Sequence, residues 1–295
     1  MINTSLINLK DIVAEYGNDL RNINLENKNF TKCDLTNVLL PADKELFQKA
    51  LFKSLKYSKF NNIDFSYYNM SGVDVEWCCF KNGVKFPKEE NFLINLKGAS
   101  VRNTTIHVED LEQYSFEGLD VFGVEFSVSV NLPKRYDLFQ IVKDKNISNV
   151  VLPFNDYSNY NFDDVCLLGT KFTEDSKVAV TKDFFQKIKG KNLNFASLPG
   201  LDYSECNFAG VSLFYTTFGK KTVFPKDYAL FRKVAIMQES KLGERYNADI
   251  HLYDLKNIPY TLRLNNVSPL QTAILYGKYF SELKQNKIKI FNDKK

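Results

Sequence analysis

The chain is poor in the residues that carry most enzymatic and metal chemistry. Its 295 residues include only two histidines and five cysteines: His107, His251, Cys33, Cys78, Cys79, Cys166 and Cys206. The cysteine count is odd and no C-x-x-C motif occurs, so we interpret them as free thiols of a reducing compartment. The same scarcity argues against Ser-His-Asp or Cys-His catalysis and against a metal site, so we expect neither a cofactor nor a metal.

The chain also lacks segments and motifs that mark export, membrane insertion and nucleotide binding. Met1 to Leu20 contains Lys10, Asp11 and Glu15, so this stretch is not a secretory signal. No stretch approaches the roughly 20 apolar residues of a membrane span. The sequence contains no G-x-x-x-x-G-K-[ST], G-x-G-x-x-G, H-E-x-x-H or G-x-S-x-G. We predict a protein without a membrane span, cytoplasmic in the producing cell or exported into a host cell by a leaderless route.

The net charge of +4 is small for this length. It requires no nucleic-acid partner, and we expect none. It also argues against a strongly acidic surface.

What the chain has is a repeat of 46 residues. The repeat is marked by Leu40-Pro41, Phe86-Pro87, Leu132-Pro133, Val178-Ala179 and Phe224-Pro225. Phenylalanines keep the same step at Phe80, Phe126, Phe172 and Phe218. A register held through four copies predicts one structural unit stacked on itself.

A shorter period of five residues runs inside each repeat. Apolar residues stand at Leu55, Phe60, Phe65, Met70, Val75 and Phe80, and the series resumes at Val101, Ile147 and Leu193. Five is neither the 3.6 of a helix nor the 2.0 of a strand. It predicts a backbone that turns a corner every five residues and directs each central side chain inward. The residue two before the centre is often apolar as well, as in Ile63, Val73 and Cys78.

The local pattern resembles the pentapeptide-repeat family, A-(D/N)-L-x-x. Matching stretches are Cys33-Asp34-Leu35, Ile63-Asp64-Phe65, Tyr160-Asn161-Phe162, Leu201-Asp202-Tyr203 and Cys206-Asn207-Phe208. The resemblance covers residues 23–224 and implies a right-handed quadrilateral β-helix with four pentapeptides per coil. The chain departs from the family by favouring Phe and Tyr at the centre. It also has Tyr68, Tyr114 and Tyr160 where Ala is usual.

Sixteen residues of each repeat interrupt the five-residue period, as in Pro41 to Lys56 and Pro133 to Ser148. A proline opens three of the four inserts and favours a first helical turn. Apolar residues then recur at i, i+1 and i+4, one face of a short helix, as at Leu46, Phe47 and Ala50. Six pentads and one insert make eight sides, or two coils. We therefore predict a mainly β solenoid with one short helix per repeat stacked along one side.

The two ends are predicted to close the solenoid. Residues 1–22 have helical spacing and suit an N-terminal helical cap, and residues 23–240 form the repeat region. Residues 241–295 are expected to be a helical C-terminal cap. The alternative for this last segment is an ankyrin-like fragment, because Ser268 to Ala273, followed by Gly277, resembles the ankyrin T-P-L-H-x-A opening.

Three columns of the repeat are candidates for special roles. Asp64, Asp110, Asp156 and Asp202 form an unbroken acidic column, with members about 9.6 Å apart by strand spacing. They are candidates for partner binding or catalysis, and alternatively hydrogen-bond a corner. Gly72, Gly118, Asp164 and Gly210 are expected to need positive φ. Trp77 is outward and unrepeated, its column continuing as Gly123, Gly169 and Tyr215; Trp77 and Tyr215 are candidate partner contacts.

Three functions remain open at this point. We favour a non-enzymatic protein-interaction scaffold, since solenoids offer long regular surfaces. The module looks like the pentapeptide β-helix of bacterial effectors with a HECT-like ligase part, which implies a protein partner and a role in virulence. A second branch of the family mimics DNA and binds topoisomerases, but its rods are acidic. The third possibility is a carbohydrate-active enzyme that uses the Asp column.

Overall fold

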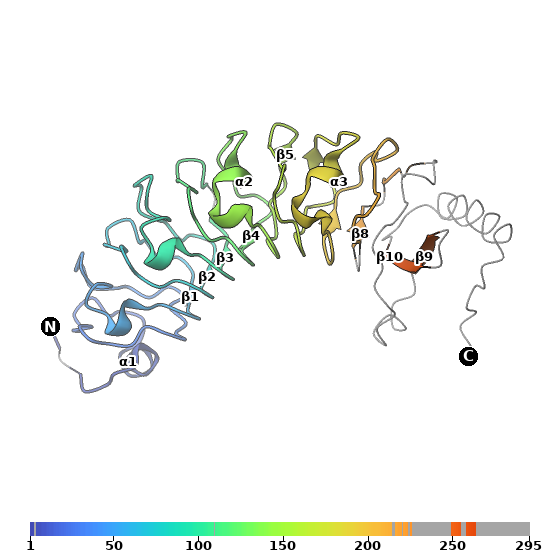
Figure 1. Ribbon diagram of the computed structural model, residues 1–295. Coiled ribbons are helices and arrows are strands. Elements are labelled where there is room, and N and C mark those ends of the chain that lie inside the picture. Colours follow the sequence, from blue (N-terminus) through green and yellow to red (C-terminus); the bar gives the residue numbers. More distant parts are fainter. Residues whose placement is uncertain are drawn as a thin grey trace, which may run out of the picture. The chain divides into compact units, whose positions relative to one another are not determined.

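The computed structural model describes residues 1–2, 4–108, 110–213, 216–219, 221–223 and 225, and the backbone of 249–254 and 258–263. The chain divides into two compact units, Met1–Pro153 and Phe154–Lys295, which can be followed by colour in Figure 1. Very short strands, turns and short helices make up the described part of both units.

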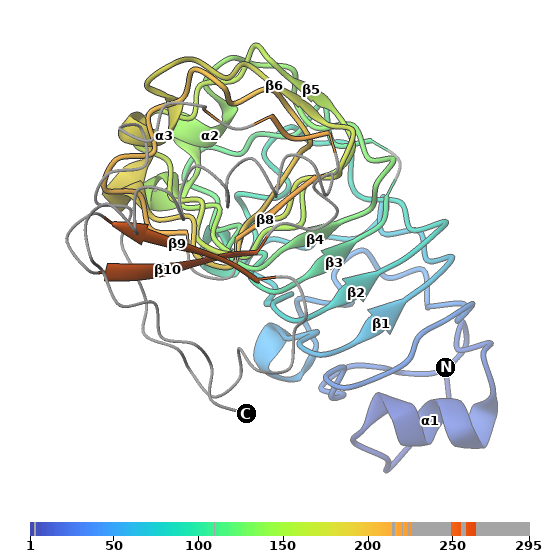
Figure 2. The ribbon, with the colours of Figure 1, turned by 90° about the vertical axis from the view of Figure 1, so that its right-hand side faces the viewer.

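Parallel pairing of two-residue strands organises the first unit. Its elements are α1 (Leu9–Tyr16), the 3₁₀ helix η1 (Leu51–Lys53), β1 (Lys59–Phe60), β2 (Cys79–Phe80), the 3₁₀ helix η2 (Lys97–Ala99), β3 (Thr105–Ile106), β4 (Glu125–Phe126), α2 (Leu138–Ile141) and the 3₁₀ helix η3 (Lys143–Lys145). The four strands form one sheet in chain order, β1-β2-β3-β4, and lie side by side in Figure 2.

The register of this sheet reproduces the sequence repeat. Phe60 is paired with Phe80, Phe80 with Ile106, and Ile106 with Phe126. The number of residues between paired positions is thus smaller from β1 to β2, larger from β2 to β3 and smaller again from β3 to β4; we call these separations the short and the long step. We call the stretch from one strand to its neighbour a pass, so that one short and one long pass together make one sequence repeat. Isolated parallel bridges, such as Ser54 to Asp74 and Asp64 to Lys85, pair the same passes away from the sheet.

The core of the first unit consists of the five-residue centres. Each centre from Leu55 to Phe80, from Val101 to Phe126, and at Ile147 and Leu152, is buried, which confirms that prediction. The rings of Phe60 and Phe80 stack at 5.0 Å between centroids with an interplanar angle of 13°. Because a buried Phe contributes about 1.5–3 kcal/mol, these aromatic centres account for much of the stabilisation of the stacked passes.

Turns with positive φ connect the centres. In the turn from Met70 to Val73, the N–H of Val73 donates to the carbonyl of Met70 at 3.0 Å, and Gly72 has a φ of 70°. Gly118, Asp164 and Gly210 have φ values of 68°, 59° and 73°, so the positive φ predicted for this column is confirmed. The N–H of Gly72 donates to the carbonyl of Asn95 at 2.8 Å, which ties one pass to the next.

The inserts are less helical than predicted. The insert that begins at Pro41 has a single helical turn, in which Lys49 N–H donates to the Glu45 carbonyl at 3.0 Å, before η1. The backbone then becomes extended at Ala50 and left-handed at Phe52, with φ 61°, so a longer helix cannot form. Even α2 has only four residues.

The apolar columns of the inserts nevertheless pack as expected. Among the described members, all are buried except the half-buried Phe184: Leu46, Phe47, Ala50, Phe92, Leu93, Leu96, Leu138, Phe139, Val142, Phe185 and Ile188. The later members Leu230, Phe231 and Val234 lie outside the described residues. Phe47 contacts the rings of Phe30, Phe65 and Tyr68 at 5.1–5.6 Å between centroids.

The second unit repeats this local organisation. Its elements are β5 (Asp156–Tyr157), β6 (Lys177–Val178), α3 (Phe184–Lys187), the 3₁₀ helix η4 (Lys189–Lys191), β7 (Ser197–Leu198), β8 (Thr217–Phe218), β9 (Asp249–Asp254) and β10 (Ile258–Arg263). Parallel pairing joins β5 to β6, with Tyr157 opposite Val178, and β7 to β8, with Leu198 opposite Phe218. The described five-residue centres from Tyr157 to Phe172 and from Leu193 to Phe218 are buried.

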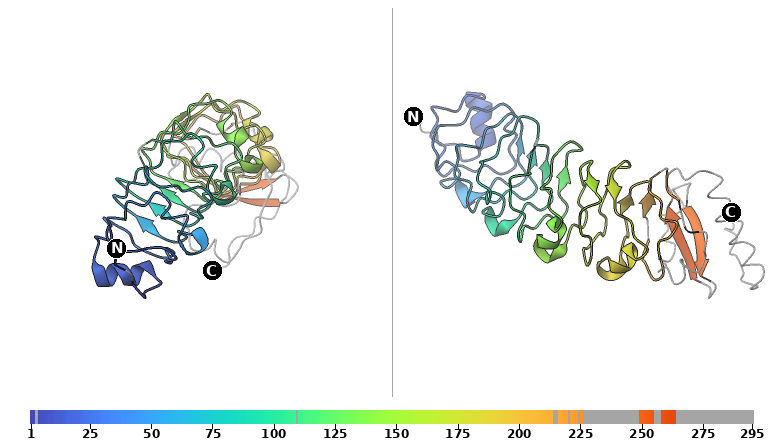
Figure 3. Two further views of the ribbon diagram at one scale, coloured as in Figure 1. Left: turned by 90° about the vertical axis from the view of Figure 1, so that its left-hand side faces the viewer. Right: turned by 90° about the horizontal axis from the view of Figure 1, so that it is seen from above.

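A helix is present in the expected N-terminal cap, whereas the described part of the expected C-terminal helical cap is a pair of strands. The predicted N-terminal segment 1–22 contains α1, in which Leu9 and Ile12 are buried. In segment 241–295, where a helical cap was expected, the described backbone is the antiparallel pair of β9 and β10, labelled in Figure 1 and seen from above in Figure 3. The ankyrin-like stretch from Ser268 to Gly277 lies outside the described residues.

Two phenylalanines of the second unit provide a matched test of the inward columns. Phe162 is 5% exposed and contacts the rings of Phe172 and Phe184, whereas Phe195 is 53% exposed. We expect Phe162→Ala to lower the free energy of unfolding by about 3–5 kcal/mol, because it leaves a cavity in the core. Phe195→Ala should change it by less than about 1 kcal/mol. Urea unfolding monitored by circular dichroism measures both; equal midpoints for the two variants would contradict the assignment of the column.

Candidate partner-binding site

Trp77 occupies a strained, exposed place in a turn. It is the third residue of the turn from Val75 to Cys78, has a φ of 61°, and is 50% exposed. The same place in later repeats is held by Gly123 and Gly169, with φ values of 69° and 67°. This conformation suits glycine and is disfavoured for a bulky side chain by about 1–2 kcal/mol. The indole is therefore kept at a position where the backbone alone would favour glycine.

Tyr57 lies beside Trp77 on the preceding pass. It is also 50% exposed and left-handed, with a φ of 64°. The two rings stack at 6.1 Å between centroids with an interplanar angle of 23°. The Lys32 Nζ lies 5.9 Å from the centroid of the Tyr57 ring, within the range of a cation–π contact. Lys32, Tyr57 and Trp77 thus form a short column, which we call the aromatic column.

Sequence reasoning identified Trp77 but missed Tyr57 and Lys32. The signal was present, since Tyr57 precedes Trp77 by the same short step that separates the paired Phe60 and Phe80. Short and long passes alternate, so no single spacing in the sequence identifies the residues that lie side by side on neighbouring passes. The strand register is needed to find them. The full repeat alone groups Trp77 with Gly123 and Gly169, not with Tyr57.

Exposed aromatic residues with positive φ occur elsewhere in the described ranges. Phe52 has a φ of 61° and Phe195 has a φ of 62°, and both side chains are exposed. Phe195 holds the repeat position of Tyr57, three repeats later, and Tyr215 holds that of Trp77. Tyr215, a predicted partner contact, lies outside the described residues.

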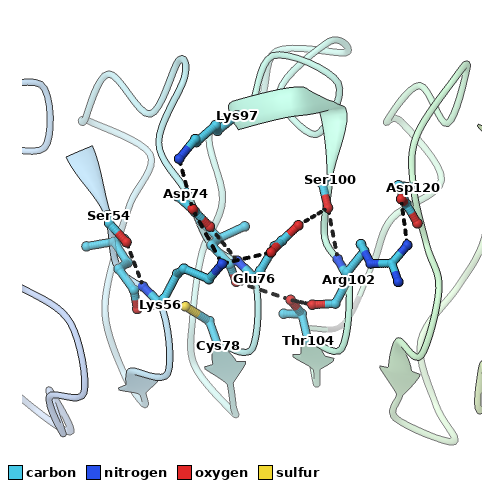
Figure 4. Close-up of polar contacts among 12 residues, drawn as sticks. Ser54, Lys56, Asp74, Glu76, Cys78, Lys97, Ser100, Arg102, Thr104 and Asp120 are labelled. Atoms are coloured by element: carbon cyan, nitrogen blue, oxygen red, sulfur yellow. Dashed lines mark hydrogen bonds and ion pairs between the residues drawn. The ribbon is translucent and has the colours of Figure 1, made fainter. Parts of the chain in front are cut away.

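A ladder of ion pairs, drawn in Figure 4, includes Lys56 and Glu76, the residues that directly precede Tyr57 and Trp77 in the chain. Lys56 Nζ lies 2.9 Å from Glu76 Oε2 and 3.7 Å from Asp74 Oδ2, and Lys97 Nζ lies 3.2 Å from Asp74 Oδ2. Ser100 Oγ donates to Glu76 Oε1 at 2.8 Å. These contacts join three consecutive passes, so they fix the face beside Trp77 as one connected polar surface.

Protonation in this ladder follows from its pairing. The hydrogen bond to Glu76 raises the pKa of Lys56 above its ordinary value. Partial burial opposes ionisation of Glu76, but the hydrogen bonds from Lys56 and Ser100 lower its pKa below the usual range. Both groups are therefore charged at neutral pH, and the pair persists under ordinary conditions.

Arg102 extends the ladder to the pass that follows Trp77. The N–H of Trp77 donates to the carbonyl of Arg102 at 3.1 Å. The Arg102 guanidinium lies 3.0 Å from Asp120 Oδ2 and 4.4 Å from the centroid of the Phe122 ring. Asp120 also lies 3.6 Å from Lys143 Nζ. Cations thus outnumber carboxylates at this end of the ladder.

The four aspartates of the acidic column have a turn role in the structure. Their Oδ1 atoms accept hydrogen bonds from the N–H two residues later at 2.8–3.0 Å: Asp64 from Ser66, Asp110 from Glu112, Asp156 from Ser158 and Asp202 from Ser204. Asn69 does the same for Ser71 outside this column. The arrangement matches the corner hydrogen bond weighed in the sequence, and offers little support for catalysis.

The cysteines provide no activated nucleophile among the described residues. All five are free thiols. Desolvation raises the pKa of Cys33 to about 11 and that of Cys206 to about 12, which disfavours the reactive thiolate. Beside Trp77, Cys78 is buried and Cys79 is half-buried. Within the described ranges, no group of three or more His, Cys, Asp or Glu side chains is placed to hold a metal ion.

A groove of about 550 Å³ lies between the inserts that begin at Pro41 and Pro87. Its lining includes Lys44, Tyr67, Met70 and Phe92. Two of its polar side chains bond to each other within the fold, since Asn69 Nδ2 donates to Glu45 Oε2 at 2.9 Å. The aromatic column is therefore the stronger candidate for binding.

No family model, curated protein or solved structure matches this chain. In the part of the chain that the structure describes, no helix has the length and apolar character that crossing a bilayer requires.

The strain at Trp77 leads to a prediction about stability. Trp77→Gly should relieve about 1–2 kcal/mol of left-handed strain. It should lose about 0.5–1 kcal/mol to the entropy of the unfolded glycine and about 0.5–1.5 kcal/mol from the ring pair. The net change in the free energy of unfolding is expected to stay within about 1 kcal/mol, whereas a buried Trp truncated to Ala costs about 3–5 kcal/mol. Destabilisation in that larger range, measured by urea unfolding, would assign Trp77 a structural role instead.

Proposed function

We propose that this chain is a right-handed quadrilateral β-helix of the pentapeptide-repeat type, built from two coils per sequence repeat, that serves as a non-enzymatic scaffold for a protein partner. Support for the architecture comes from the parallel pairing of passes at alternating short and long steps, from Phe60 to Phe80 and from Phe80 to Ile106. The short step fits a coil of four pentapeptides, and the long step fits a coil enlarged by an insert. The buried side chain at every fifth position supports the architecture as well.

The observation that carries the proposed function is the exposed stack of Tyr57 on Trp77. Both aromatic residues have left-handed backbone conformation. One repeat later, Asn103 and Gly123 occupy the equivalent turn positions with the same conformation. An aromatic pair that strains the fold and leaves half of its surface exposed contributes little to stability. Partner binding accounts for it better, because Trp and Tyr are the residue types most enriched at the centres of protein interfaces.

The proposed setting is that of a bacterial effector or of the partner-binding module of one, acting in the cytoplasm of the producing cell or inside a host cell. Support comes from the resemblance to the β-helix of HECT-like ligase effectors. The topoisomerase-binding alternative needs an acidic face, whereas Lys56, Lys97 and Arg102 alternate with carboxylates beside Trp77. The carbohydrate-enzyme alternative is weakened because the aspartates hold turns.

Affinity capture with crosslinking from host and bacterial lysates tests the scaffold. The informative variant is Tyr57→Asn with Trp77→Gly, since both replacements are the residues that later repeats use at the same turns. We expect captured proteins to fall at least tenfold, as removal of two central aromatic contacts costs about 2 kcal/mol or more.

Phe52→Gly is the matched control for this capture. Phe52 is likewise an exposed aromatic residue with positive φ, and Gly98 holds its place in the next repeat. This variant should capture as the parent does. Undiminished capture by the double variant would show that partners bind elsewhere or not at all.

A further inference from the structure

The charges around the aromatic column are unevenly paired. Glu76, Asp74 and Asp120, the carboxylates of the flanking ladder, each lie within 4 Å of a Lys or Arg nitrogen. By contrast, Lys32 and Lys59 form no ion pair among the described residues. Lys32 lies over the Tyr57 ring, and Lys59 is exposed two residues beyond Tyr57, in register with Cys79. Positive charge without an ion pair therefore lies over the Tyr57 ring and two residues beyond it along the chain.

The neighbouring carboxylates of the described chain offset that charge only in part. Asp34 pairs in register with Lys59, but its Oδ1 accepts hydrogen bonds from the N–H and hydroxyl of Thr36 at 3.1 and 2.7 Å. It lies near both Lys59 and Lys81, so one carboxylate faces two ammonium groups. The next carboxylate toward Trp77 is Glu76, which is already bonded to Lys56 and Ser100.

We propose that the aromatic column binds an acidic peptide segment that carries a proline or aromatic ring. The ring of the peptide packs against Tyr57 and Trp77, and its carboxylates face Lys32 and Lys59. This inference rests on the proposed scaffold function and specifies its partner chemistry. Planar rings that are half-exposed bind apolar rings with little loss of side-chain entropy. Two unpaired lysines select carboxylates and speed their approach.

A peptide fits better than a nucleic acid. Proteins that hold a nucleic-acid backbone neutralise several phosphates, typically about 6–10 for stable duplex binding. Lys32 and Lys59 are two described lysines without an ion pair on or near the aromatic column, and Glu76 directly precedes Trp77 and would repel a phosphate chain. A short acidic peptide needs no more than these two cations.

Trp77 makes the proposal directly measurable because it is the only tryptophan of the chain. Its fluorescence therefore reports this site alone. In the free protein, the ratio of iodide to caesium quenching of Trp77 should exceed the ratio for free N-acetyltryptophanamide, since the local excess of positive charge concentrates anions. A ratio equal to or below that of N-acetyltryptophanamide would overturn the electrostatic basis of the proposal.

Titration of the full chain with defined probes tests the ligand. The probes are a synthetic peptide of alternating glutamate and proline, a lysine–proline peptide of the same length, and polyuridylate. We expect the glutamate–proline peptide to shift Trp77 emission to shorter wavelength and to protect it from iodide, an effect that weakens as salt is added. A lack of response to the glutamate–proline peptide would refute the proposed acidic-peptide ligand. An equal response to the lysine–proline peptide or to polyuridylate would refute it as well.

Charge reversal supplies the matched variants. Lys32→Glu with Lys59→Glu retains both rings and should weaken the glutamate–proline peptide at least tenfold. Lys88→Glu reverses an exposed lysine on the insert that begins at Pro87 and should bind as the parent does. Equal affinity of all three proteins would exclude the lysines as determinants.

The two proposals fail separately. If the Tyr57→Asn, Trp77→Gly variant loses capture but excess glutamate–proline peptide does not reduce capture by the parent, the scaffold proposal stands and the acidic-peptide inference is wrong. Capture that the double variant keeps would remove the scaffold site itself, whatever the peptide does.

Discussion

A left-handed residue at the third place of a turn, found in many but not all of the described turns, is the constraint on which the stacking of the described passes depends. Its N–H points along the stack and donates to the next pass, as Gly72 does to Asn95 at 2.8 Å and Gly118 to Ile141 at 2.7 Å. With the turn closed in four residues, the next buried centre follows after five. The periodic core is therefore a consequence of the turn geometry, and the aromatic centres supply the burial that stabilises it.

The same constraint explains why the candidate site can be separated from the scaffold. A turn that needs positive φ is best served by Gly or Asn, and most repeats have those residues there. Tyr57 and Trp77 adopt the same φ, and their N–H groups still donate to the carbonyls of Glu76 and Arg102, at 3.4 and 3.1 Å. These hydrogen bonds are longer than the 2.8 and 2.9 Å of Asn103 and Gly123 at the same turns one repeat later. Side chains at this place can thus change while the backbone stays the same, which leaves them open to selection for binding.

Much of the core and part of the site could be predicted from the sequence. The five-residue period identified the buried centres, and the recurring Gly72, Gly118 and Gly210 indicated positive φ. The inserts were predicted as short helices from their apolar i, i+1, i+4 pattern. A single helical turn followed by extended backbone, as at Ala50, buries the same residues, so the pattern does not distinguish the two structures. Neighbours across passes, such as Tyr57 and Trp77, depend on a register of alternating short and long steps, which the length of the whole repeat does not reveal.

The repeats themselves show how such a surface arises. At the two turn positions of the aromatic column, the first repeat has Tyr57 and Trp77, the second Asn103 and Gly123, and the third Asn149 and Gly169. The fourth returns to aromatic residues with Phe195 and Tyr215. The described members of this series share φ values between 54° and 69°, so the backbone is the same whether the side chain is a ring or a hydrogen atom. Backbone φ therefore does not distinguish the repeats, but packing between the two positions does. A Cβ at Gly123 would collide with the side chain of Asn103, so asparagine at the first position requires glycine at the second, whereas a ring at the first position accepts a ring beside it.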